Sequence, residues 1–198
     1  MHTKSSFFCM HNYYDLFTQC KNGDTKAQRI VYDLFKAKLM GLCRRYTRDR
    51  GGAQDVLQES FIKIFKCMHQ LESAEKLEGW MKSIVVNTAI NQYHRTKKHE
   101  LIFTNVSENY TDTEGVQSLQ QHMQTFPDEF LVSLVNALPD GCRMVFNLFA
   151  IEGYSHAEIA EKLQITEGTS RSQLHHAKYL LKEKLKCQSL AHYYEKFA

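Results

Sequence analysis

The polar side chains between residues 171 and 178 have the types and the spacing to contact DNA. Apolar residues recur at helical spacing through the same stretch, at Leu174, Ala177, Leu181 and Leu185. If these residues face a core, the side chains left on the outward face are Arg171, Ser172, Gln173, His175, His176 and Lys178. A helix of this kind has the size that a DNA major groove admits.

The residues before this helix predict a second helix and a tight turn. Ser155 and Glu158 fit the S-x-x-E capping box, which fixes the start of a helix. Ile159 and Leu163 share a face of that helix, and Gln164-Ile165 forms a short turn before Thr166, which can cap the next helix. The pattern favours a helix-turn-helix that binds DNA, and an ordinary surface hairpin of two helices is the alternative.

Two asparagines in the middle of the chain form a second group of polar residues. Asn87 and Asn91 are four residues apart and therefore share one face of an expected helix. Asparagine is a mediocre helix former, but its amide can donate and accept, which suits the edge of an unpaired base. The alternative is that both amides hydrogen-bond a neighbouring loop. Positive charge follows at Arg95, Lys97 and Lys98, where it can neutralise DNA phosphates.

The composition predicts an all-α protein. The chain has 198 residues, 43% of them hydrophobic, and only two prolines. Strand-like alternation is scarce. No apolar run approaches the roughly 20 residues that a membrane helix needs, and the first residues lack the apolar core of a secretory signal, so we expect a cytoplasmic protein without membrane insertion.

The cysteines and histidines do not form a recognisable metal site. The six cysteines are scattered without a C-x-x-C pair, and no Cys/His spacing among them and the ten histidines matches a zinc ligand set. We expect reduced, often buried thiols. No nucleophile–base pair or phosphate-binding glycine loop is visible either. The sequence therefore predicts neither a metal nor a cofactor, and no enzyme.

Charge and periodicity divide the chain into two small domains. Residues 26–100 carry 15 Lys and Arg against 8 Asp and Glu, whereas residues 101–127 carry three acidic residues and no Lys or Arg. We therefore expect an N-terminal extension at 1–25, a basic domain at 26–100, an acidic linker at 101–127, a second domain at 128–186 and a tail at 187–198. The basic half is expected to bind a polyanion.

Three helices are expected in the first domain. The first has Ile30, Leu34, Lys38 and Cys43 along it and is broken at residues 48–52. The second covers 55–68, with Leu57, Phe61, Ile64, Phe65 and Met68 on its apolar side. A looser segment at 69–79 leads to the third, at about 80–97. Regular helix is expected to resume at Asp128.

Together, the two halves resemble a bacterial RNA polymerase sigma factor of the extracytoplasmic-function subfamily. The resemblance is carried by RRYTRDRGGAQDVLQESFIKIFK (44–66), by EGWMKSIVVNTAINQYHRTKK (78–98) and by LPDGCRMVFNLFAIEGYSHAEIAEKLQITEGTSRSQLHHAKYLLKEKL (138–185). It implies sigma region 2 in the first half and the helix-turn-helix of region 4 in the second. The implied function is to direct core polymerase to promoters and to assist their opening.

The resemblance also implies roles for individual residues. Asp55, Gln58 and Glu59 would dock on the clamp helices of the polymerase's largest subunit, although acidic residues near a helix start also simply complement the helix dipole. Asn87 and Asn91 would belong to the pocket for a flipped base of the minus-ten element, beneath a specificity loop at about 69–79. The acidic linker would occupy the channel of nascent RNA, unless it is a plain tether. An anti-sigma factor is an implied partner.

In the second half, the resemblance makes residues 166–182 the recognition helix for the minus-thirty-five element. Groove contacts are then expected from Arg171, Ser172, Gln173 and His176, and phosphate contacts from Thr169 and Lys178. The chain departs from the family pattern at four positions, namely Gln164 for a turn glycine, Ser170 for a valine, and Gln173 and His176 for arginines. The promoter sequence of other members should therefore not be transferred.

Two other functions fit parts of the pattern. The first is a stand-alone helix-turn-helix regulator whose residues 26–100 form a sensor or dimerisation domain. The second is a metal- or redox-responsive sensor based on the Cys and His content. Neither explains the paired Asn87 and Asn91 with the basic helix end.

Overall fold

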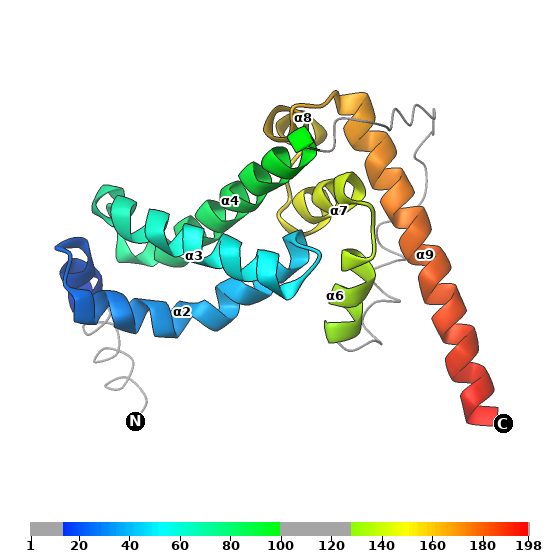
Figure 1. The fold of residues 1–198 in the computed structure, drawn as a ribbon, viewed down its shortest axis with the longest axis horizontal. Helices are drawn as coiled ribbons and strands as arrows, with labels where there is room; N and C mark the ends of the chain where they lie inside the picture. The colour runs from blue at the N-terminus through cyan, green and yellow to red at the C-terminus, as the bar shows by residue number, and fades with distance from the viewer. Residues whose placement is uncertain (1–13, 100–127, 198) are drawn as a thin grey trace, which may run out of the picture. The chain divides into compact units, whose positions relative to one another are not determined.

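The computed structural model describes residues 14–99 and 128–197, and the regular structure within these residues is helical (Figure 1). Residues 14–21 are helical and precede α2 (Thr25–Tyr46), α3 (Arg50–Cys67), the 3-10 turns η1 (Met68–Gln70) and η2 (Ala74–Lys76), and α4 (Leu77–His99). The second stretch contains α6 (Asp128–Asn136), α7 (Asp140–Phe146), the π-helical turn η3 (Asn147–Ile151), α8 (His156–Leu163) and α9 (Glu167–Phe197). The chain divides into two compact units between Asn91 and Gln92, within α4. The predicted all-α fold is confirmed.

Helices α2 and α3 pack against each other and run in opposite directions (Figure 1). An aspartate N-cap fixes the start of each helix. The carboxylate of Asp24 accepts the amide of Ala27 at 2.7 Å, and that of Asp49 accepts the amide of Gly52 at 2.8 Å. The predicted break is present, but it is confined to residues 47–49. Because Asp49 is a good N-cap, α3 starts at Arg50 rather than at Asp55, and both glycines lie in its first turn.

The apolar face predicted for α2 is wrong at two positions. Ile30 is 49% exposed and Leu34 is 59% exposed. The buried side of the helix instead includes Ala27, Val31 and Leu39. The stripe of Ile30 and Leu34 ends at Lys38, whereas the neighbouring stripe continues through Leu39 to Cys43, and the longer stripe is the buried one. On α3 and the η1 turn after it, the predicted stripe is confirmed at Leu57, Phe61, Ile64 and Met68, which are buried, whereas its fifth member, Phe65, is half-buried.

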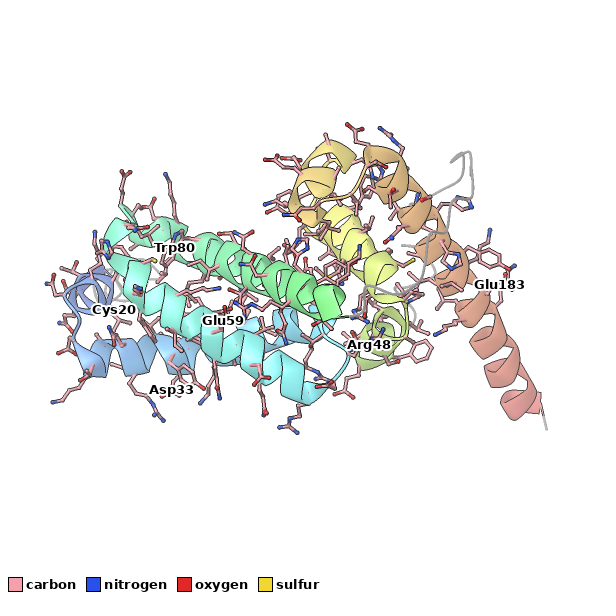
Figure 2. The ribbon with its side chains drawn as sticks, turned by 45° about the horizontal axis from the view of Figure 1, so that its top comes forward. Cys20, Asp33, Arg48, Glu59, Trp80 and Glu183 are labelled. Carbon is pink, nitrogen blue, oxygen red and sulfur yellow. The ribbon has the colours of Figure 1, made fainter. Side chains whose placement is uncertain are left out.

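The helical segment at residues 14–21 packs on the first domain, although the sequence placed it in an extension. Phe17 and Cys20 are 6% and 1% exposed, respectively. Cys20 lies at the end of the unit where α4 starts (Figure 2). Apolar burial of this kind is what fixes a terminal segment to a domain.

In the second unit, α7, α8 and α9 enclose a core of fully buried leucine and isoleucine side chains, among them Leu148, Ile159, Leu174 and Leu181. The guanidinium of Arg143, 3% exposed, pairs with Asp140 and donates to the carbonyls of Asn136 and Leu138 at 3.3 Å. These bonds satisfy carbonyls at the end of α6. Helix α9 continues to Phe197, so residues 187–197, expected to form a tail, are helical.

Among the residues that the structure describes, no helix combines the length and the low polarity needed to cross a membrane.

Candidate functional site

The helix-turn-helix begins with the predicted capping box, which the structure confirms. The side chain of Glu158 accepts the Ser155 amide at 2.8 Å, and the Ser155 hydroxyl accepts the Glu158 amide at 3.3 Å. The hydrogen bond from the Ser155 backbone amide lowers the pKa of Glu158. The start of α8 is therefore fixed by two reciprocal bonds.

The turn between α8 and α9 also follows the prediction. Gln164 ends α8 in the left-handed region, with φ 54° and ψ 47°, where the family frequently has glycine. The Thr166 hydroxyl accepts the amide of Thr169 at 3.0 Å and so caps α9. Ile159 and Leu163 on α8 face the same core as Leu174 on α9. Together these contacts hold α9 at a fixed angle to α8.

The outward face of α9 presents Ser172, His176 and Tyr179, at positions i, i+4 and i+7. His176 and Tyr179 are exposed, and their rings are parallel within 17° at a centroid separation of 6.5 Å. Tyr179 is 56% exposed. It was not predicted as a site residue, although its seven-residue spacing from Ser172 indicates that the two share a helical face. Leu174, Ala177 and Leu181 are buried on the opposite side, as predicted.

Other predicted contact residues lie at the edges of this face. Arg171 is exposed and donates to the Glu167 carboxylate at 2.8 Å. The Ser172 hydroxyl donates to the Thr169 carbonyl at 3.0 Å, and the Thr169 hydroxyl lies 2.9 Å from that of Thr166. Lys178 is half-buried. A DNA contact by Arg171, Ser172 or Thr169 stays a prediction, and it requires the side chain to leave the intramolecular partner described here.

Gln173 points toward α7 rather than along the outward face. Its amide lies over Gly141, where an added Cβ would overlap with Gln173 Oε1. This oxygen is buried, and no hydrogen-bond partner for it is found among the described residues. A base contact by Gln173 stays a prediction, and it requires the amide to leave Gly141.

The two asparagines of α4 are both exposed, one turn apart on the same side of the helix. Arg95 follows a further turn along and is also exposed. Ala89 is buried on the opposite side, and Thr88 and Ile90 are buried on the two flanks of the asparagine face. The polar face predicted from the sequence is therefore accessible to a ligand.

The basic end of α4 continues beyond these asparagines. Lys97 is exposed, with its Nζ 5.7 Å from the centre of the Tyr93 ring. Lys98 belongs to the helix, but its side chain lies outside the described residues. Tyr46, whose ring could otherwise stack on a base, is 4% exposed and so lies in the core. Trp80, near the start of α4, is half-buried (Figure 2).

The three residues expected to bind the polymerase differ in their surroundings on α3. Asp55 and Gln58 are exposed, whereas Glu59, labelled in Figure 2, is half-buried and pairs with Lys63 at 2.8 Å. Lys63 also donates to the hydroxyl of Thr88 on α4 at 3.1 Å. Glu59 thus takes part in a link between α3 and α4.

The helix dipole does not explain Asp55. Because α3 starts at Arg50, its first turn contains no acidic residue, and the influence of the dipole fades beyond that turn. One turn after Gln58, Ile62 is 68% exposed. Ile62 is not among the residues predicted to bind the polymerase, although its i, i+4 spacing from Gln58 places the two on a shared face.

Among the described residues, Cys20, Cys43 and Cys142 are buried free thiols, and Cys67 is a half-buried one. Burial raises the pKa of Cys20 and Cys142 to about 11 and that of Cys43 to about 12. A raised pKa suppresses the thiolate, which is the form that binds metals and reacts with oxidants. Within residues 14–99 and 128–197, no group of three or more His, Cys, Asp or Glu is arranged to hold a metal ion. Cys9 and Cys187 lie outside the described side chains.

Comparisons with known proteins agree with this arrangement of two helical units. The protein-family model for Sigma-70 region 2 matches residues 31–99, and the protein-family model for Sigma-70, region 4 matches residues 131–181. The ECF RNA polymerase sigma-E factor of Haemophilus influenzae is 29% identical over 177 residues, 86% of this chain and 93% of that protein. The ECF RNA polymerase sigma factor SigW of Bacillus subtilis is 28% identical over 179 residues, 85% of this chain and 94% of the relative.

A solved structure of the sigma factor RpoE in complex with the anti-sigma factor NepR from Bartonella quintana is 19% identical. The matched region covers 80% of this chain and 96% of the chain in that structure, with a TM-score of 0.45.

Proposed function

The chain belongs to the extracytoplasmic-function sigma factors, and from this membership we propose how its residues direct RNA polymerase to promoters. Its function is to bring the polymerase to promoters, without catalysis of its own. The observation that carries the proposal is that both DNA-reading regions occur in one chain, at residues 31–99 and 131–181. The proposed domains are 26–100 and 128–186, joined by an acidic linker at 101–127 that lies outside the described residues.

Core polymerase binds the polar face of α3. Asp55 and Gln58 are exposed there and contact the clamp helices of the largest subunit directly. Glu59 adds negative charge to the same face, but its pairing with Lys63 makes its first role structural. Removal of Glu59 is therefore expected to disturb the α3–α4 packing as well as docking.

The minus-ten element is read by α4. Asn87 and Asn91 hydrogen-bond the edge of a base that leaves the duplex stack, and the energy of this binding offsets the few kcal/mol of unstacking and unpairing. Arg95, Lys97 and Lys98 continue the helix and neutralise the phosphates beside the opened duplex. The loop at 69–79 covers the base pocket.

The minus-thirty-five element is read by α9. Arg171, Ser172, Gln173 and His176 contact base edges in the major groove, and Thr169 and Lys178 contact phosphates. Each good bidentate base contact contributes about 1–3 kcal/mol of discrimination. Because Gln173 and His176 replace the family's usual arginines, the preferred sequence of this element should differ from that of other members.

Regulation follows from the same membership. We propose an anti-sigma factor as the partner that keeps the protein from promoters until it is needed, and the cytoplasm as the compartment in which it meets the polymerase. The redox alternative loses support at Cys20, Cys43 and Cys142, because burial raises the pKa of these three thiols.

The test is reconstitution. The purified chain is added to sigma-free bacterial core polymerase, and transcription starts are mapped on genomic DNA. We expect a stable complex and a small set of starts that share two upstream elements. A chain that binds duplex DNA specifically but does not bind core polymerase would contradict the proposal and favour the stand-alone regulator.

A further inference from the structure

The helical segment at residues 14–21 contacts the loop that leads into α4. The Lys21 ammonium donates to the carbonyl of Leu71 at 2.9 Å, and the Tyr14 hydroxyl donates to the Glu75 carboxylate at 2.7 Å. These residues are 50 and 61 positions apart in the sequence, respectively. The segment therefore reaches the loop at two separate points along it.

The segment itself is firmly attached to the domain. Phe17 and Cys20 are buried, and the Lys21 ammonium lies 5.5 Å from the centre of the Phe17 ring. A lysine held against an aromatic ring keeps less rotational freedom. The donor that meets Leu71 is consequently held in place by the core and not only by the bond that it makes.

The loop depends on such contacts for its shape. Its apolar residues Leu71 and Ala74, together with Leu77 at the start of α4, are 7%, 1% and 1% exposed, respectively, and anchor it from one side. Between these anchors it forms only short 3-10 turns, in which few backbone groups are paired internally. The carbonyl of Leu71 and the side chain of Glu75 are the points where the N-terminal segment adds a restraint.

The chemistry of the outer contact is that of a charge-assisted hydrogen bond. A tyrosine phenol keeps its proton at physiological pH and is therefore the donor, and the hydrogen bond to the Glu75 carboxylate raises the pKa of Tyr14 further. Bonds of this type are shorter and stronger than those between neutral groups. Tyr14 and Glu75 are both exposed, so the contact restrains the loop without burying it.

We propose that Tyr14 and Lys21 are positioning residues that hold the loop at 69–79 in place and thereby set the base preference at the minus-ten element. This inference rests on the proposed function of the loop as the cover of the base pocket. A loop held at two points presents one shape to the captured base, whereas a loosened loop accommodates several bases.

The test compares holoenzymes on a template library that is randomised across the minus-ten element. Core polymerase is reconstituted with the wild-type chain, Tyr14→Phe, Lys21→Met or Lys21→Arg, and the transcribed templates are sequenced. Gln19→Ala is the matched control, because Gln19 is exposed on the same segment. Core affinity and the preference at the upstream element are measured in parallel.

Tyr14→Phe and Lys21→Met are expected to lower the ratio of preferred to other bases by about threefold to tenfold, as the loss of one hydrogen bond implies. Lys21→Arg and Gln19→Ala should keep the wild-type ratio. Core affinity and the upstream preference should be unchanged in all variants. Amide exchange of residues 71–77 should be faster in Tyr14→Phe and Lys21→Met than in the wild type.

Two results would overturn the inference alone. One is a selective wild type with equally selective Tyr14→Phe and Lys21→Met variants. The other is a loss that affects core affinity and both promoter elements equally, because a general loss of folding would then be the cause. If the wild-type holoenzyme itself shows no preference at the minus-ten element, the proposed function of α4 and its loop fails first.

Discussion

The Nδ1 atom of His156 lies 2.9 Å from the hydroxyl oxygen of Ser170 and so joins the first residue of α8 to a fully buried residue of α9. The ring of Phe149 stacks on His156 at a centroid distance of 4.6 Å. Ser170 stands where the family has an apolar valine. The buried hydroxyl of Ser170, which replaces the valine of the family, is thus paired with His156 at the start of α8.

This pairing predicts non-additive effects. Ser170→Ala should lower the stability of the α8–α9 pair by about 0.5–1.5 kcal/mol, and His156→Phe by about 1–3 kcal/mol, because it leaves a buried hydroxyl without a partner. The double variant should lose less than the sum of the two. Amide exchange across α8 and α9 measures these stability losses. Tryptophan fluorescence would not report on them, because the single tryptophan, Trp80, lies in the other unit. Strictly additive losses would contradict the pairing.

The turn before α9 carries backbone strain that glycine should relieve. Gln164 has φ 54°, and a residue with a side chain is disfavoured there by about 1–2 kcal/mol. Gln164→Gly should therefore stabilise the second unit by about 0.5–1 kcal/mol, after the greater freedom of glycine in the unfolded chain is subtracted. Calorimetry of the full chain measures the shift.

The converse change is the control for this prediction. Gly153 has φ 79° and open space around its missing Cβ, so Gly153→Ala should destabilise the same unit through the backbone alone. A stability loss on Gln164→Gly would instead mean that its side chain makes a contact more valuable than the strain.

Glu78 predicts a dependence of stability on acid pH. Hydrogen bonds from Lys38 on α2 and Lys82 on α4, at 2.7 and 2.8 Å, lower its pKa to about 2. A folded-state pKa below the unfolded value stabilises the fold above about pH 4.5. This stabilisation is lost as the pH falls from there toward 2. Because the side chain is 39% exposed, solvent screening limits the effect to roughly 0.5–1 kcal/mol.

Urea unfolding followed by the fluorescence of Trp80 measures this effect. Glu78→Gln should weaken the first unit at pH 6 and flatten its pH dependence between 4.5 and 2, and high salt should reduce the difference. Glu72→Gln changes an exposed carboxylate in the preceding loop and should do neither. A pH dependence that is identical in Glu78→Gln and in the wild type would contradict the assignment.

Arg171 is the residue of α9 whose replacement should affect promoter choice most clearly. Arg171→Ala should weaken selection at the upstream element by about 1–3 kcal/mol, as measured by transcription from a library randomised there. Lys186→Ala is a matched control, since it also removes one positive charge and one exposed ion pair from the same helix. An unchanged preference, or an equal effect of both variants, would refute a base contact by Arg171.

The sequence predicted those parts of the fold that depend on local rules. The capping box at Ser155, the cap at Thr166 and the leucine stripe of α9 each follow from neighbouring residues, and the structure confirms them. The covered face of α2 was missed although the sequence carries a signal for it. The stripe of Ile30 and Leu34 ends at Lys38, whereas Val31, Phe35, Leu39 and Cys43 remain apolar at i, i+4 spacing, and this longer stripe is the one on the buried side.

The candidate site shows the same division. The exposed Asn87 and Asn91 follow from helical spacing, whereas the position of the Gln173 amide over Gly141 depends on how α7 crosses α9. The contacts of Tyr14 and Lys21 with the loop join residues 50 or more positions apart. Local sequence patterns do not predict contacts over such separations.

Promoter opening by asparagine variants tests the central claim most directly. The measurement is the fraction of holoenzyme that forms open complexes on a mapped promoter, alongside core affinity, for Asn87→Ala and Asn91→Ala. Loss of a base contact should weaken opening by about 1–3 kcal/mol, or roughly fivefold to 150-fold, with core affinity unchanged. The α3 variant Gln58→Ala should show the opposite pattern. Equal loss of opening and core affinity in the asparagine variants would make Asn87 and Asn91 structural and contradict the account.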